Sequence, residues 1–293
     1  MSWRTVMITK PSKLDYSMGY LVVRDVDSTV KIHLSEISVV IVENTASSVT
    51  AVLMNQMIAK KIKVIFCDEK RNPSFELTAY YGSHDCSRKL KKQIEWSVTA
   101  KQQTWTSIVA EKIKNQMLVL KHFELEQYKM LLDYLGELEF NDESNREGHS
   151  AKVYFNALFG KTFSRSDDIP TNSALNYGYS LILSCFNREV VLNGYLTQLG
   201  LFHDNMFNQY NLSCDIMEPF RPVIDLKVKY MMPAKFDKDE KVQLISLLNS
   251  EFVIDNRDNT LLNTIKIYAK SVFNAIEEND ISLIKYPQMN YEL

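Results

Sequence analysis

The chain has little of what marks several protein classes. Among its 293 residues are only eight glycines, seven prolines and four cysteines, whereas linkers and collagen-like chains are rich in glycine and proline. Apolar residues make up 45% of the chain, which is enough for a substantial core in one large or two modest domains. We therefore expect a globular protein.

Export signals, membrane spans and paired cysteines are also missing from the sequence. The N-terminus has no apolar run of signal-peptide length, and no stretch is apolar for the roughly 18 residues that a membrane helix needs. We therefore expect a cytosolic protein. Because Cys67, Cys86, Cys185 and Cys214 stand far apart without C-x-x-C spacing, we expect small buried residues rather than a zinc knuckle or a disulfide framework.

The net charge of −2 does not by itself suggest a nucleic-acid binder, so a local basic patch would have to bind phosphates. The densest candidate is a predicted helix in which basic residues alternate with aromatics, formed by Arg88, Lys89, Lys91, Lys92, Trp96, Lys101, Trp105, Lys112 and Lys114. Such a stripe could follow a phosphate backbone. Taken alone, it is more typical of a solvated helix face.

The first 68 residues are predicted to be rich in β-strands. Apolar residues alternate over 30–34 and again over 37–41, and residues 63–67 form a third apolar run. Between them, residues 48–61 have near-helical apolar spacing, with Ser47 or Ser48 as the N-cap.

Helical patterns replace this alternation after Asn72-Pro73. We predict an α+β fold, with a small N-terminal β-rich domain at 1–75 and a larger all-α domain at 76–293. The tail from Tyr286 is expected to be loosely held and could dock on a partner. Predicted helices lie at 86–120, 123–138, from Glu147 onward, 173–193 and 239–278.

Glu147 is the first candidate catalytic residue along the chain. Ser144-Asn145-Arg146-Glu147 matches the S-x-x-E capping box, in which the glutamate only caps a helix. However, Glu147 also falls on the apolar face of its predicted helix, where a carboxylate must be paired, hydrogen-bonded or bound to a cation. The helix alone leaves both interpretations open.

Two later segments offer possible partners for Glu147. His203 follows Gly200 in a predicted turn that should expose the imidazole, although a lone histidine is most often structural. Asp215 and Glu218 would share a helical face, either as a binding site for Mg²⁺ or Mn²⁺ or as acids that suit a helix N-terminus. Arg221 could neutralise Glu218 or bind a substrate phosphate.

Together these segments resemble the CRISPR spacer-acquisition integrase, the first-numbered Cas protein, in its subtype II-A form. The resemblance covers most of the chain, although other branches of that family often have aspartate where this chain has Glu218. The matching strings are Gly19 to Arg24, Lys63 to Lys70, Arg146-Glu147-Gly148 with Ala151 and Tyr154-Phe155, Asn172 with Leu175 to Tyr179, Gly200 to His203, and Asp215 to Pro222.

The resemblance implies a catalytic site in which Glu147, His203 and Glu218 bind one Mg²⁺ or Mn²⁺, with Asp215 as a supporting or alternative ligand. It also implies transesterification, in which prespacer 3′-hydroxyls attack the CRISPR repeat. A ligand histidine must be neutral, so activity should fall at acidic pH.

The expected partners follow from the same resemblance. They are prespacer and repeat DNA, a second copy of the chain paired through the N-terminal sheet, a dimer of the second-numbered Cas protein in a four-plus-two complex, and the subtype II-A ring-forming accessory protein and effector nuclease. Candidate phosphate contacts are Arg88, Lys92, Lys152 and Arg221, and Tyr154 or Tyr177 could stack on DNA ends.

Two other functions are consistent with the same residues. A metal-dependent nuclease would hydrolyse branched or single-stranded DNA, with water in place of the 3′-hydroxyl. A non-enzymatic scaffold would organise DNA or proteins and would bind no metal. The sequence does not separate the two nucleophiles.

Overall fold

The computed structural model describes residues 4–80 and 83–291 in two compact units, Met1–Tyr80 and Tyr81–Leu293. The first unit contains β-sheets and the second is mainly helical, which confirms the predicted fold class. The chain passes from the first unit to the second a few residues after the boundary expected at 75/76.

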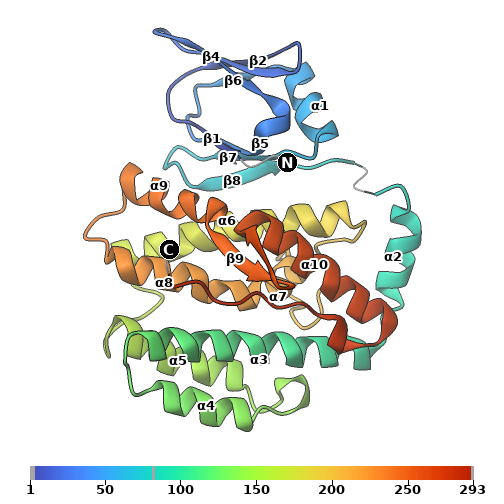
Figure 1. The fold of residues 1–293 in the computed structure, drawn as a ribbon, viewed down its shortest axis with the longest axis vertical. Coiled ribbons are helices and arrows are strands. Elements are labelled where there is room, and N and C mark those ends of the chain that lie inside the picture. Colours follow the sequence, from blue (N-terminus) through green and yellow to red (C-terminus); the bar gives the residue numbers. More distant parts are fainter. Residues whose placement is uncertain (1–3, 81–82, 292–293) are drawn as a thin grey trace. The chain divides into compact units, whose positions relative to one another are not determined.

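The N-terminal unit contains two four-stranded sheets, ordered β4-β3-β2-β6 and β1-β5-β7-β8 (Figure 1). Helix α1 at Ala51–Ala59 and the 3-10 turn η1 at Leu34–Glu36 accompany them. The strands are β1 (Arg4–Ile8), β2 (Lys13–Ser17), β3 (Tyr20–Arg24), β4 (Thr29–His33), β5 (Ile37–Val42), β6 (Ser48–Val49), β7 (Lys63–Cys67) and β8 (Pro73–Leu77).

Apolar burial explains the centre of this unit. Every residue of β5 is buried, and β5 lies parallel to both β1 and β7, as expected for an uninterrupted apolar strand. The predicted N-cap of α1 is wrong, because Ser48 pairs with β2 as part of β6. The cap position is Thr50 instead.

The second unit is built mainly from helices. A two-stranded hairpin, β9 (Glu251–Ile254) and β10 (Arg257–Thr260), interrupts them. The helices are α2 (Cys86–Ile94), α3 (Val98–His122), α4 (Tyr128–Gly136), η2 (Phe140–Asp142), α5 (Arg146–Phe159), α6 (Pro170–Leu192), α7 (Asn211–Met217), η3 (Glu218–Phe220), α8 (Arg221–Met231), α9 (Lys238–Ser246), η4 (Leu247–Asn249), α10 (Leu261–Glu278) and η5 (Ile281–Leu283).

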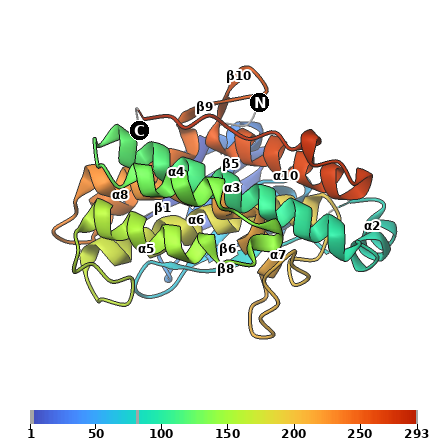
Figure 2. The same ribbon diagram turned by 90° about the horizontal axis from the view of Figure 1, so that it is seen from below.

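Helix α3 is the long central element of the helical unit. It contacts α4, α5, α7, η3, α8 and α10, and Figures 1 and 2 show α4 and α5 along one side of it. The predicted helix at 86–120 is in fact two helices, because the Ser97 hydroxyl accepts a hydrogen bond from the Ala100 N–H and starts α3.

Two further segments differ from the prediction. The hairpin falls within the range expected to be helical, where Asp255 and Asn256 both take the positive φ angles of a tight turn. The tail from Tyr286 packs on its own unit: the Tyr286 hydroxyl bonds Ser107 in α3, and the Gln288 N–H donates to Val253 in β9.

The four cysteines are free thiols. The expectation that all of them are buried holds for Cys67 and Cys185, whereas Cys86 and Cys214 are partly buried. Across residues 4–80 and 83–291, none of the helices combines the length and the apolar character that a bilayer crossing requires.

Candidate functional site

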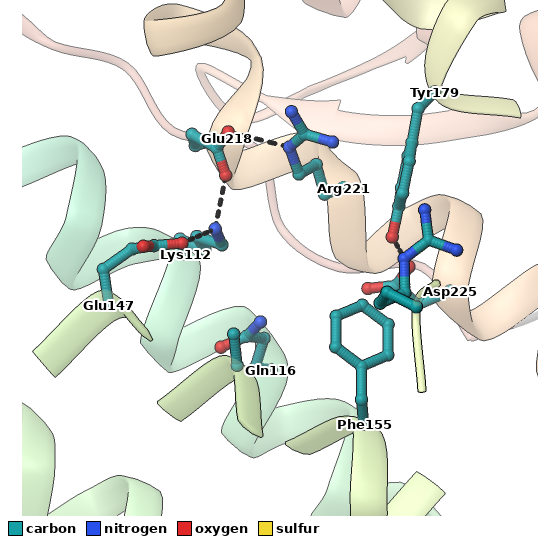
Figure 3. Close-up of a pocket in the computed structure, with 10 residues that line it drawn as sticks. Lys112, Gln116, Glu147, Phe155, Tyr179, Glu218, Arg221 and Asp225 are labelled. Carbon is teal, nitrogen blue, oxygen red and sulfur yellow. Dashed lines mark hydrogen bonds and ion pairs between the residues drawn. The ribbon is translucent and has the colours of Figure 1, made fainter. Parts of the chain in front are cut away.

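A cavity of about 230 Å³ opens among α3, α5, α6, η3 and α8 (Figure 3). Its walls carry both predicted acids, Glu147 and Glu218, together with Lys112 and Arg221. The cavity therefore brings together side chains that lie far apart in the sequence.

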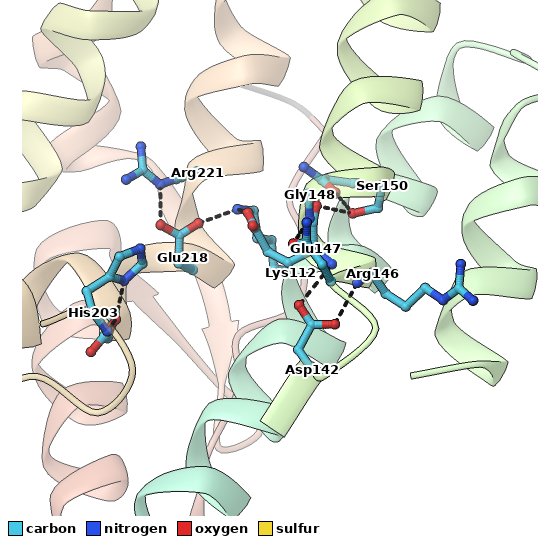
Figure 4. Close-up of polar contacts among 12 residues, drawn as sticks. Lys112, Asp142, Arg146, Glu147, Gly148, Ser150, His203, Glu218 and Arg221 are labelled. Carbon is cyan, nitrogen blue, oxygen red and sulfur yellow. Dashed lines mark hydrogen bonds and ion pairs between the residues drawn. The ribbon is translucent and has the colours of Figure 1, made fainter. Parts of the chain in front are cut away.

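Glu147 reaches the cavity from the first turn of α5. The predicted capping box is wrong, because Asn145 is the N-cap, with its side chain accepting a 3.3 Å hydrogen bond from the Gly148 N–H. The Asp142 carboxylate accepts a 3.1 Å hydrogen bond from the Glu147 backbone N–H (Figure 4). The Glu147 carboxylate is thus not used as a cap and forms an ion pair with Lys112.

Glu218 lies at the start of η3 and is buried, with a side chain 6% exposed. One of its oxygens pairs with Lys112, and the other accepts a 2.7 Å bond from Arg221 Nε. Burial alone would raise the pKa of Glu218, but the charges of Arg221 and Lys112 outweigh it and hold the pKa at about 2. Glu218 is therefore a carboxylate at any ordinary pH.

Lys112 extends from α3 between the two acids (Figures 3 and 4). It is one of the residues expected on a solvated or phosphate-binding stripe, but its side chain is only 7% exposed and its Nζ contacts both Glu147 and Glu218. Burial favours a lower pKa for Lys112, yet the two carboxylates prevail and raise it. The ammonium therefore keeps its proton.

His203 lies in the exposed loop before α7, as predicted. Its Nδ1 bonds the buried carboxylate of Asp215, which also accepts hydrogen bonds from the backbone N–H groups of Leu201, Phe202 and His203 at 2.6, 3.0 and 3.2 Å. Gly200 allows this close approach, because a Cβ there would lie 2.3 Å from the His203 carbonyl oxygen. Asp215 thus orients His203, whereas Glu218 pairs with Lys112 and Arg221.

Electrostatics link this loop to the two acids. The hydrogen bond to Asp215 raises the pKa of His203, burial opposes the shift, and the charges of Asp215, Glu218 and Glu147 add to it. Trp105, one of the aromatics in the stripe predicted to be a solvated face or a phosphate-binding one, is buried in α3, where its ring stacks on Phe202 and meets His203 edge-on. Trp105 therefore packs against the loop that carries His203.

A divalent cation suits the donor set, although the side chains do not already enclose one. Within the described ranges, no three His, Cys, Asp or Glu side chains meet at one point. However, the carboxylates of Glu147 and Glu218 already converge on a single cation, the Lys112 ammonium. Because Asp215 occupies Nδ1 of His203, the Nε2 lone pair is the one suited to a metal. Oxygen and imidazole donors fit Mg²⁺ or Mn²⁺.

The far wall of the cavity contains residues that the sequence did not single out. Tyr179 donates to the buried Asp225, and the guanidinium groups of Arg221 and Arg165 lie 4.7 and 5.4 Å from the centre of the Tyr179 ring. Arg165 donates hydrogen bonds to the neutral side-chain amides of Asn172 and Asn176. Only the general preference of guanidinium groups for phosphate could have suggested Arg165 beforehand.

The other candidate DNA contacts are more scattered. Lys152 is exposed on α5, Arg88 pairs with Asp85 at 2.6 Å, and Lys92 pairs with Glu277 at 3.0 Å. The expectation that Tyr154 or Tyr177 stacks on DNA is wrong, because they are 0% and 3% exposed and pack in the core.

Comparison with known proteins places the chain in a family. A family profile described as CRISPR associated protein Cas1 matches residues 6–244. The CRISPR-associated endonuclease Cas1 of Neisseria meningitidis serogroup C (strain 8013) is 30% identical over 295 residues, which covers 99% of this chain and 97% of that relative. The chain belongs to the Cas1 family. A Cas1 of Francisella tularensis subsp. novicida (strain U112) is 25% identical over 80% of this chain and 81% of its own length.

Solved structures share the Cas1 fold. A casposase bound to an integration product has a TM-score of 0.77 at 15% identity, covering 96% of this chain and 92% of its own. A CAS1 protein from Thermotoga maritima has a TM-score of 0.75 at 14% identity, with coverages of 93% and 97%. At these identities the likeness concerns the fold alone.

Proposed function

We propose that this Cas1 family member joins prespacer DNA to a CRISPR repeat by metal-dependent transesterification, with Glu147, His203 and Glu218 as catalytic metal ligands. The observation that carries the proposal is the convergence of Glu147 and Glu218 on one cation at the wall of a cavity that also presents Arg221. The cavity contains the charges that phosphodiester chemistry needs: carboxylates to bind a metal and guanidinium groups to bind phosphates.

Each residue has a distinct role in this reaction. Mg²⁺ or Mn²⁺ bound by the three ligands would neutralise charge on the scissile phosphate and on the departing alkoxide. Asp215 acts as a positioning residue, because its bond to Nδ1 fixes the ring of His203 and leaves Nε2 for the metal.

Arg221 and Arg165 provide the phosphate contacts within the cavity. Arg221 uses Nε for Glu218, and within the described part of the chain its two Nη nitrogens have no hydrogen-bond acceptor. These nitrogens can bind a phosphodiester bidentately. Lys152, Arg88 and Lys92 are the proposed outer DNA contacts, and Arg88 and Lys92 would have to exchange Asp85 and Glu277 for phosphates.

The proposed partners rest on the family and on the solved relatives. Structures that share this fold include a Cas6-RT-Cas1–Cas2 complex, a Cas1–DNA complex and the casposase with its integration product. We extend their DNA and Cas2 partners to this chain, with homodimer pairing through the N-terminal sheet and a four-plus-two assembly. Membership of subtype II-A, with its accessory protein and effector nuclease, rests on the sequence motifs alone; the genes next to this one would test it.

Hydrolysis by the same ligands is the second candidate, because the relatives carry the name endonuclease. A labelled prespacer incubated with a repeat-bearing plasmid and Mn²⁺ separates the two reactions. Strand transfer produces a covalently joined species, whereas hydrolysis produces only shorter strands.

The test of the site is Glu147→Gln, which keeps the shape of the side chain and removes its charge. We expect a folded protein that binds DNA but forms no joined product, while Glu143→Gln, which changes an exposed acid between η2 and α5, keeps full activity. Undiminished strand transfer by Glu147→Gln would refute the ligand assignment.

A further inference from the structure

We infer that Lys112 competes with a divalent metal for Glu147 and Glu218, and thereby sets the metal affinity of the site. The inference rests on the proposed metal site and assigns a role to a residue outside its ligand set. It follows from the position of one buried ammonium group between two carboxylates.

Helix α3 holds Lys112 firmly in register with both acids. Asn115 Nδ2 donates a 2.9 Å bond to the carbonyl of Pro219, next to Glu218. Gln116 accepts a 3.1 Å bond from Ser150 in α5, the helix that carries Glu147. Because α3 is tied to both elements within one turn of Lys112, the ammonium lies between the acids as a result of the fold.

A lysine ammonium and a divalent ion seek the same oxygens. The ammonium is a compact cation with three donors, and here it satisfies one carboxylate on each side. A divalent ion bound by the same two side chains would lie within a few ångströms of Nζ, where the repulsion between the two cations is large. Metal binding therefore requires the ammonium to leave.

The structure provides room for the displaced side chain. The adjoining cavity of about 230 Å³ is lined by Lys112 and by Asp225, a further acid. The four-carbon lysine stem is flexible enough to turn into this space. The apparent metal affinity is then the intrinsic affinity multiplied by the fraction of molecules in which Lys112 has withdrawn.

Removal of the competitor gives the first test. Lys112→Met keeps an unbranched side chain, one heavy atom shorter, and removes the charge. Lys114→Met removes a half-exposed lysine that pairs with Glu111 on the same helix. In calorimetry with Mn²⁺ and no DNA, we expect Lys112→Met to bind at least about tenfold more tightly than wild type, and Lys114→Met to match wild type.

The same titration separates the inference from the proposed function. Equal Mn²⁺ affinity in wild type and Lys112→Met would overturn competition and leave the metal site intact. Weaker binding by Lys112→Met would also overturn it, because the lysine would then organise the ligands. If neither protein binds Mn²⁺, both proposals fail.

A second measurement uses the wild-type protein and so avoids any loss of fold in the variant. Acetylation of lysines by an amine-reactive ester, followed by mass spectrometry, reports whether each Nζ is accessible. Mn²⁺ should raise the labelling of Lys112 several-fold and leave that of Lys114 unchanged. No rise at Lys112 at saturating Mn²⁺ would contradict the displacement.

Discussion

The two sides of the site are held in place by different forces. On the loop side, backbone N–H groups and the His203 ring all donate to Asp215, whose side chain is fully buried. On the helix side, Glu147 and Glu218 are held by ion pairs with Lys112 and Arg221. Hydrogen bonds to the backbone fix a geometry, whereas ion pairs can be exchanged for another cation.

This difference indicates which part of the site is preorganised. The direction of the His203 ring is determined before any metal binds, because Asp215 is tied to the same loop. Glu147 and Glu218, by contrast, form ion pairs with Lys112, and a bound metal would have to displace that ammonium. Substitutions on the loop side should therefore affect stability most, and those on the helix side should affect ion binding most.

The largest effect is expected from Asp215→Ala, which removes the carboxylate that accepts all of these hydrogen bonds on the loop side. Loss of the shared acceptor leaves the N–H groups of the loop unsatisfied and frees the His203 ring, so we expect the free energy of unfolding to fall by about 3–5 kcal/mol, with loss of activity. Urea unfolding measures the change. Asp204→Ala, an exposed acid in the same loop, should change stability little; a comparable loss there would show that the loop is simply sensitive.

The next effect concerns two buried carboxylates on the helix side, Asp225 and Glu218, whose pKa values are shifted in opposite directions. Burial raises the pKa of Asp225 to about 7, despite the opposing effects of the Tyr179 bond and the Arg221 and Arg165 charges, while the pKa of Glu218 is about 2. The folded pKa of Asp225 lies above its ordinary value of 3.8, so the folded state holds this proton more tightly than the unfolded state does. The stabilisation of the fold by protonated Asp225 is therefore complete below about pH 4 and is lost as the pH rises through 7.

Asp225→Asn tests this difference, since the amide stays neutral and can still accept from Tyr179. Between pH 4 and pH 8, wild type should lose about 4 kcal/mol of unfolding free energy relative to Asp225→Asn. Urea unfolding at several pH values provides the comparison. Parallel pH profiles for the two proteins would show that Asp225 ionises normally.

The smallest expected effect is that of Trp105→Phe, beneath the loop side. Phenylalanine can still stack on Phe202 but fills less of the site, so a cost of about 1–2 kcal/mol is expected. The edge-on contact with His203 is weakened, so the imidazole resonances in NMR should broaden or shift. If they stay unchanged, Asp215 alone orients the ring.

The architecture could be predicted wherever periodicity was strong. The fully buried strand β5 and the long helices α3 and α6 follow directly from their apolar patterns. The hairpin at Glu251–Thr260 was missed because its strands are short and are flanked by helical patterns. The break at Ser97 depended on a single cap, which apolar spacing does not report.

The candidate site was only partly predictable. Glu147 stood out as an acid on an apolar face, His203 as a residue in a turn, and Glu218 as an acid three residues from Asp215. Their assignment as ligands remains a prediction. Lys112 was hidden among exposed lysines of the same stripe, because its burial depends on acids more than thirty residues away in sequence. Asp215 was expected beside Glu218, but it accepts hydrogen bonds from backbone N–H groups of the loop that precedes α7, and apolar spacing does not report such bonds.

The tail segment 286–291 acts as a strap between the hairpin and the central helix. Tyr286 bonds Ser107 in α3, five residues before Lys112, and Asn290 Nδ2 donates a 2.7 Å bond to the Glu251 carbonyl in β9. A protein that bound segment 286–291 would first have to detach it from α3. Binding of a partner to the tail would then alter the contacts of α3, the helix that carries Lys112, without any contact with the cavity itself.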